Sequence, residues 1–458
     1  MKTKRAYLSL LPAVISACLA LPFTSTADAV ITNGVLTEAV TAITGSTGDD
    51  QIVVSQSTNA TGTLSVSTNI DIPVLASATG VDGLAGNDTI TNAATLQAAA
   101  VTSLSAPLKS GESTGLAAST GITGGTGSDL IANSGTLVST SSVRTVVQEL
   151  YLLPISPGIS GADTESRAEA VGISGGSGGD QIINSGTVRV NANAGSELNK
   201  STFSLASLPL DVFATGDSDV RSFASATGIS AGTNSALDQV FNSGTLQVSA
   251  VSTSLISQVS MEMFGASRIS GMTVSTGTVA GISGNAGNNR LTNSGTINAN
   301  ATAGALFSSG EIKKKGLFVK SILDLFADVG SFNVIADAGG VGMDGGDGDD
   351  ILRNELTNAT ISVTGNAYAR SDQMTLAISL PAPGGSAPTV ASVATLAAVT
   401  AAAEVADTSE TNYTRADPYA DAKSVAISTV AGMAGWAWTL SATSTSKAVS
   451  TPATPGRT

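Results

Sequence analysis

One pattern recurs seven times along the chain, and it constrains the fold more than any other feature. It is clearest at 121–137, GITGGTGSDLIANSGTL, and at 172–188, GISGGSGGDQIINSGTV. The acidic positions of successive copies are separated by 38, 41, 51, 58, 51 and 61 residues. A motif that stays constant while its spacers vary in length is typical of stacked repeat units, in which insertions form loops on one face of the stack.

Each copy is predicted to form a strand, a turn and a second strand. Apolar and polar residues alternate on both sides of a glycine-rich turn, which favours β-structure. Gly124, Gly125 and Gly127 would supply positive φ angles in the turn, and Ile131 and Leu137 would point inward between coils. Because 42% of residues are apolar but only 4% are aromatic, the core must consist of thin aliphatic layers. The prediction is an all-β fold, a parallel β-solenoid (β-helix) of about seven irregular repeats.

An asparagine recurs four residues after most of the acidic positions, usually before Ser-Gly-Thr. In a parallel solenoid, identical amides from successive coils can hydrogen-bond to one another inside a turn. We therefore predict a structural asparagine ladder rather than a catalytic role. The residues are Asn92, Asn133, Asn184, Asn242, Asn293 and Asn354.

The segments outside the motif divide the chain. The solenoid is expected over 30–365, followed by an Ala/Pro/Thr-rich excursion or linker at 366–425 and a partial or degenerate eighth repeat at 426–458. That last segment is either an interrupted copy or a divergent cap. Apolar spacings of three and four at 143–153 and 317–329 suit short amphipathic helices, with a further pair of strands as the alternative.

The N-terminus has the form of an export signal. Lys2, Lys4 and Arg5 precede an apolar stretch at 6–20, and Ala-Asp-Ala at 27–29 has the small-x-small form of a cleavage site. Pro12 interrupts the stretch, which is shorter than the ~20 residues that span a bilayer. Residues 1–29 are therefore interpreted as a signal peptide, with no transmembrane span in the mature chain.

The single cysteine offers a second processing route. Ile-Ser-Ala at 15–17 followed by Cys18 resembles a bacterial lipoprotein box, which implies a lipid anchor at Cys18. The apolar residues directly after Cys18 favour ordinary cleavage instead. Both routes lead to a secreted or cell-surface protein, with the periplasm as a further possibility.

Charge and composition limit the partners. The net charge is −14, which disfavours nucleic acid and anionic lipid. The chain contains no histidine, the commonest transition-metal ligand, so hard cations that prefer oxygen ligands are the natural metal hypothesis.

The turns resemble the haemolysin-type (RTX) calcium-binding repeat, G-G-x-G-x-D-x-U-x, in which U is a large apolar residue. GGTGSDL at 124–130 fits directly, GGSGGD at 175–180 keeps the glycines and the aspartate, and GGDGDDI at 345–351 is displaced by one position. The spacing departs from the family's nine residues, Asn289 replaces one aspartate, and that family leaves cells by a C-terminal signal. The resemblance implies Ca²⁺ held by Asp344, Asp347, Asp349, Asp350, Asp129, Asp180, Asp88 and Asp50.

The chain also resembles bacterial β-solenoid surface adhesins and autotransporter passengers, through its I-x-N-x-G-T-I strands. That resemblance implies a structural or adhesive role without catalysis, with extracellular surfaces, glycans or other cells as partners. One alternative is a solenoid enzyme that acts on polysaccharides. Another is an ice- or mineral-binding solenoid, suggested by the once-per-unit recurrence of Thr95, Thr136, Thr187, Thr245 and Thr296.

Overall fold

The structure is a computed structural model. It describes residues 24–25, 30–32, 35–67, 72–107, 111–153, 161–204, 213–232, 236–262, 266–315, 332–355, 359–379, 389–407, 415–423, 427–431 and 446–451. Most of the predicted signal peptide, including Cys18, lies outside these residues. So does the predicted helix at 317–329.

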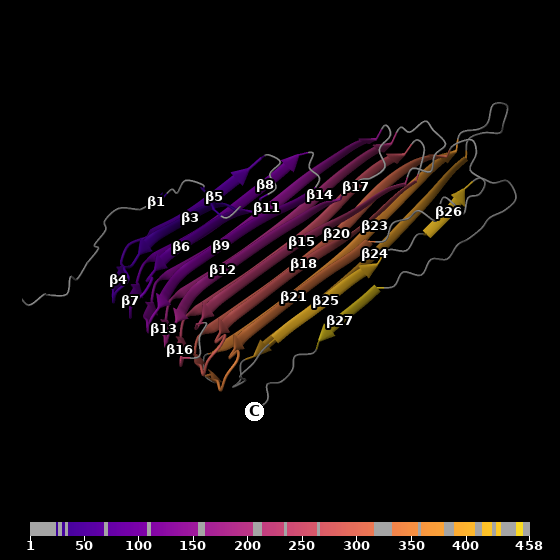
Figure 1. Ribbon diagram of the computed structural model, residues 1–458. Coiled ribbons are helices and arrows are strands. Elements are labelled where there is room, and N and C mark those ends of the chain that lie inside the picture. Colours follow the sequence, from indigo (N-terminus) through magenta and orange to yellow (C-terminus); the bar gives the residue numbers. More distant parts are fainter. Residues whose placement is uncertain are drawn as a thin grey trace, which may run out of the picture.

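Three sheets stack their strands along one direction, so the prediction of a parallel β-solenoid is confirmed (Figure 1). Each coil runs along a long strand of one broad sheet, through a short strand of the narrow sheet, and back along a long strand of the other broad sheet. The narrow sheet orders β4 (Gln51–Val54), β7 (Thr89–Asn92), β10 (Leu130–Asn133), β13 (Gln181–Asn184), β16 (Gln239–Asn242), β19 (Arg290–Asn293) and β22 (Ile351–Asn354).

The first broad sheet follows each narrow strand. It orders β1 (Thr24–Ser25), β5 (Thr58–Val66), β8 (Thr95–Pro107), β11 (Thr136–Leu153), β14 (Thr187–Ser204), β17 (Thr245–Glu262), β20 (Thr296–Lys315), β23 (Thr360–Ser379), β24 (Thr389–Asp407) and β26 (Ile427–Ala431). It is parallel as far as β23, and β24 and β26 are antiparallel.

The second broad sheet precedes each narrow strand. It orders β2 (Val30–Thr32), β3 (Val35–Thr44), β6 (Val74–Asp82), β9 (Gly111–Thr126), β12 (Ala162–Ser177), β15 (Phe213–Ser230), β18 (Ala266–Ser283), β21 (Phe332–Asp344), β25 (Arg415–Lys423) and β27 (Ser446–Thr451). Antiparallel pairs lie at both of its ends.

The aliphatic core lies between the narrow sheet and the adjoining ends of the broad sheets. Ile131 of β10 stacks on Ile90 and Ile182 of the neighbouring coils, and all three are fully buried. Leu137 and Ile122 belong to similar columns in the two broad sheets and are also fully buried. Burying such a side chain contributes about 1.5–3 kcal/mol, so the repeated aliphatic positions hold successive coils together.

Further from the narrow sheet, small and polar residues enter the interior and hydrogen bonds link the two broad sheets. A second apolar column lies beyond them, formed by Val147, Leu198, Ile256 and Phe307. The Oγ of Ser119 and the Oγ of Ser139 lie 2.8 Å apart across the sheets. Ser222 donates to the carbonyl of Thr253 at 2.6 Å, and Ser196 donates to the carbonyl of Arg221 at 2.7 Å. These serine bonds satisfy buried hydroxyl groups and join one sheet to the other.

The helix predicted at 143–153 is wrong, because these residues continue strand β11. Val143, Thr145, Val147 and Glu149 point inward and are buried, which is the period of two expected of a strand. The predicted linker at 366–425 also differs from the structure: it contains the distal part of β23 together with β24 and β25.

Candidate functional site

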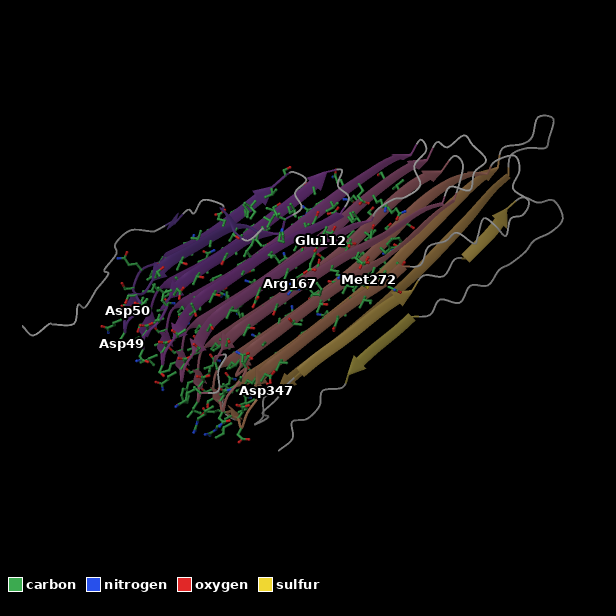
Figure 2. The ribbon with its side chains drawn as sticks, in the orientation of Figure 1. Asp49, Asp50, Glu112, Arg167, Met272 and Asp347 are labelled. Atoms are coloured by element: carbon green, nitrogen blue, oxygen red, sulfur yellow. The ribbon has the colours of Figure 1, made fainter. Side chains whose placement is uncertain are left out.

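The motif residues form the two corners of each coil, on either side of the narrow strand. We call the turn that enters the narrow strand the glycine corner, and the turn that leaves it the asparagine corner. Figure 2 shows Asp49 and Asp50 at the first glycine corner and Asp347 at the last, along the same end of the molecule. The corners are thus the one part of each coil that repeats in sequence and in space.

At the asparagine corner, the predicted ladder is confirmed. Each Nδ2 donates to the Oδ1 of the asparagine in the next coil, as between Asn133 and Asn184 at 2.7 Å. The side chains are buried, so the ladder satisfies amide groups that have no access to water. The bonds run through Asn92, Asn133, Asn184, Asn242, Asn293 and Asn354, at 2.7–2.8 Å.

The threonines after this corner also stand in one column. Thr136 pairs in register with Thr95 and Thr187, and the column continues through Thr245, Thr296 and Thr360. Thr360 and Thr296 share a hydrogen bond of 3.2 Å between their hydroxyls. The threonines of the column are half-buried or exposed, so the column lies on the surface, as the ice-binding alternative would require.

At the glycine corner, only part of the expected backbone geometry is present. Gly125 and Gly127 have positive φ angles of +99° and +133°, as predicted, but Gly124 does not have a positive φ angle. Gly124 is needed for space: a Cβ there would lie 2.4 Å from the carbonyl oxygen of Gly175 in the next coil. The turn therefore requires glycine for two different reasons, conformation and close approach.

The aspartates of the glycine corner form a second column. The backbone N–H of Asp129 donates to the Oδ1 of Asp180 at 2.9 Å, and the N–H of Asp180 donates to the Oδ1 of Asp238 at 2.8 Å. Asp50 and Asp88 donate to the next aspartate in the same way, and Asn289 donates to the Oδ1 of Asp350. The Oδ1 atom of each accepting carboxyl group thus links two adjacent coils through a hydrogen bond from the backbone. Asp238 belongs to this set, although it was not among the predicted metal ligands.

The second oxygen of these carboxyl groups is buried. Asp88, Asp129, Asp180 and Asp238 are 0–2% exposed, and their Oδ2 atoms make no hydrogen bond. Burial raises the pKa of all four and brings that of Asp180 to about 7; the amide bond to Oδ1 acts in the opposite direction. The neutral form of these groups is therefore more favoured than it is in an exposed aspartate.

The other predicted calcium ligands lie at the first and last corners. The Oδ2 of Asp50 accepts the amide of Ser46. Asp344 accepts the amide of Gly346 at 3.1 Å, while Asp347 and Asp349 are exposed. Within the described residues, no group of three or more acidic or cysteine side chains comes together as a metal site.

Calcium takes six to eight oxygen ligands at about 2.3–2.6 Å. Asp88, Asp129 and Asp180 do not fit that donor set, because one oxygen accepts an amide and the other faces glycine backbone. In the last turn, Asp347 and Asp349 offer exposed carboxylates instead, whereas Asp344 and Asp350 are half-buried and the Oδ1 of Asp350 already accepts the amide of Asn289. Calcium binding there stays a prediction.

Thermal unfolding of the full chain tests this prediction. We expect calcium, compared with a chelator, to raise the melting temperature through the last corner alone. Substituting Asp347→Asn together with Asp349→Asn should abolish the rise, and Asp129→Asn should leave it intact. Equal melting temperatures in calcium and chelator would contradict calcium binding at this turn.

No protein-family model matches the chain, and comparisons with curated proteins and with solved structures found no significant match. Across the described residues, the chain offers no helix of the length and apolar character that crossing a membrane would require.

Proposed function

We propose that the chain is an exported structural or adhesive module of a bacterial cell surface, in which the solenoid holds flat faces rigidly for contact. The observation that carries the proposal is the register of the corners. The asparagine bonds continue through six coils, from Asn92 to Asn354, and the aspartate bonds run beside them. A chain whose repeated residues serve coil-to-coil bonding is suited to a stable scaffold.

The outer side of the second broad sheet suits polar contacts. Arg167 pairs with Glu165 at 3.3 Å and lies 5.2 Å from the ring centre of Phe223 in the next coil. Arg221 pairs with Asp219 at 2.6 Å. Figure 2 shows Glu112, Arg167 and Met272 along this face. A flat surface with both charge signs and scattered apolar groups is compatible with glycans, other cells or extracellular surfaces as partners.

Surface display and adhesion test the proposal together. Intact bacterial cells that express the full chain should bind an antibody raised against it, and beads coated with the chain should adhere to glycan-coated or cell-coated surfaces. Beads coated with an unrelated acidic protein of similar charge are the control. A chain that stays inside the cell and whose beads adhere no better than the control would contradict the proposal.

Two further measurements separate the alternatives. Release of reducing sugar ends from polysaccharide would favour the solenoid enzyme. Thermal hysteresis of freezing, lost on replacing Thr187 and Thr245 by leucine, would favour ice binding by the threonine column. A scaffold or adhesin should show neither.

A further inference from the structure

At the glycine corner, a carboxyl oxygen and a carbonyl oxygen of the next coil both lie close to the position that a Cβ would take on one glycine. A Cβ built on Gly124 would lie 2.4 Å from Asp129 Oδ2 and 2.4 Å from the carbonyl oxygen of Gly175. The Oδ2 atom makes no hydrogen bond, and Asp129 is 2% exposed. The same arrangement joins Asp88 to the carbonyl of Gly124, and Asp180 to the carbonyl of Ala231. A carboxylate in this position would hold its charge against a carbonyl dipole, away from water.

Asn289 shows what the fold places at this position when the residue can donate. It replaces aspartate in the column, and a Cβ built on Gly284 would lie 2.7 Å from its Nδ2 and 2.2 Å from the carbonyl oxygen of Gly345. The Nδ2 of Asn289 donates to that carbonyl at 3.2 Å. The site of Oδ2 is therefore a donor position, and the only form of aspartate that donates is the carboxylic acid.

We propose that Asp88, Asp129 and Asp180 carry protons on Oδ2 in the folded solenoid, and donate them to the carbonyls of Gly124, Gly175 and Ala231. The ligand of this column is thus the proton, taken from water as the solenoid folds. Protonation neutralises carboxyl groups that stand above one another in adjacent coils. It also completes a second coil-to-coil hydrogen bond beside the one at Oδ1.

The charged groups that face the column also favour the protonated form of its aspartates. Asp49 and Asp50 act on Asp88, and Asp129 and Asp238 act on Asp180; all are carboxyl groups that disfavour a further negative charge. Arg290, which follows Asn289 in the chain, is exposed on the outer side of β19. The column is therefore held neutral by protons rather than by a paired cation.

The direction of the pH effect follows. The ordinary pKa of aspartate is 3.8, and burial raises that of Asp180 to about 7 in the folded chain. The contribution to stability is complete below the unfolded value and is lost as the pH rises through the folded value. The contribution of the column to stability should therefore be greatest below pH 3.8, fall as the pH rises, and be lost once the pH has passed about 7.

Infrared spectroscopy of the full chain detects the protons directly. Between about pH 5 and 6, ordinary exposed carboxyl groups are ionised, so a carbonyl band of protonated carboxylic acid should come from the column. Replacing Asp129→Asn should remove part of that band. It should also flatten the fall of melting temperature with pH, because a carboxamide donates without titrating.

Asp50→Asn is the matched control. It lies in the same column, but its Oδ2 already accepts the amide of Ser46, so an asparagine there should leave the band unchanged. The absence of a protonated carboxyl band in the unsubstituted chain would overturn the proposal, and this result does not depend on any variant folding. A band of full size in a folded Asp129→Asn chain would overturn it equally. Neither result bears on surface display or adhesion.

Discussion

Replacing Gly178 by alanine is expected to lower the free energy of unfolding by about 3 kcal/mol or more. Gly178 has a φ angle of +137°, and an added Cβ would lie 1.5 Å from the carbonyl oxygen of Gly127 in the preceding coil. That oxygen belongs to the backbone of a tightly stacked turn, so it cannot turn aside as a flexible side chain would. The midpoint of urea unfolding, followed by far-UV circular dichroism, measures the loss.

Gly48 provides the control for Gly178. It occupies the corresponding position of the first glycine corner, where an added Cβ meets nothing within 4 Å. Gly48→Ala should therefore change the midpoint little. If the two substitutions lowered the midpoint equally, the coils would not be stacked in the register described.

The motif made the corners predictable from sequence. Aligning its copies placed Asn133 beside Asn184 and Ile131 beside Ile182, and the structure has both pairs in register. The signal was strong because a residue repeated once per coil must lie above its own copy in a parallel stack. The position of Asp238 was visible for the same reason, because it lies four residues before Asn242.

The spacers were not predictable in this way. Lys200 and Glu149 form a buried ion pair with 3.5 Å between Nζ and Oε2, in neighbouring strands of the first broad sheet. Lys200 and Glu149 pair only because both long strands extend this far from their corners. No residue of the repeated motif predicts the lengths of these strands. The apolar spacings at 143–153 predicted a short helix, with strands as the alternative, and the structure has a strand because these residues pair with β8 and β14.

The two corners differ in whether identical side chains stacked in adjacent coils can satisfy one another's hydrogen-bonding groups. An amide has a donor and an acceptor, so Asn133 and Asn184 can extend a ladder indefinitely. A carboxylate has only acceptors: Asp129 and Asp180 need the backbone N–H for one oxygen and have no donor for the other. In the proposed arrangement, a stack of aspartates is therefore fully hydrogen-bonded only when each Oδ2 is protonated and donates to a carbonyl of the glycine corner.

Replacing Asn184 by alanine should lower the free energy of unfolding by about 2–6 kcal/mol. The side chain accepts from Asn133 and donates to Asn242, each at 2.7 Å, and all three residues are buried. The substitution leaves the Nδ2 of Asn133 and the Oδ1 of Asn242 unsatisfied, and each unsatisfied buried group costs about 1–3 kcal/mol. Urea unfolding of the full chain measures the change.

Asn191→Ala separates loss of the ladder from loss of an asparagine in general. Asn191 is exposed on β14, seven residues beyond Asn184, and its replacement should change stability by no more than about 0.5 kcal/mol. Asn184→Asp adds a sharper test, because an ionised aspartate keeps the acceptor for Asn133 but loses the donor to Asn242. We expect Asn184→Asp to destabilise the fold at neutral pH and to recover part of the loss in acid. A midpoint that is unchanged in Asn184→Ala would show that the ladder does not hold the coils together.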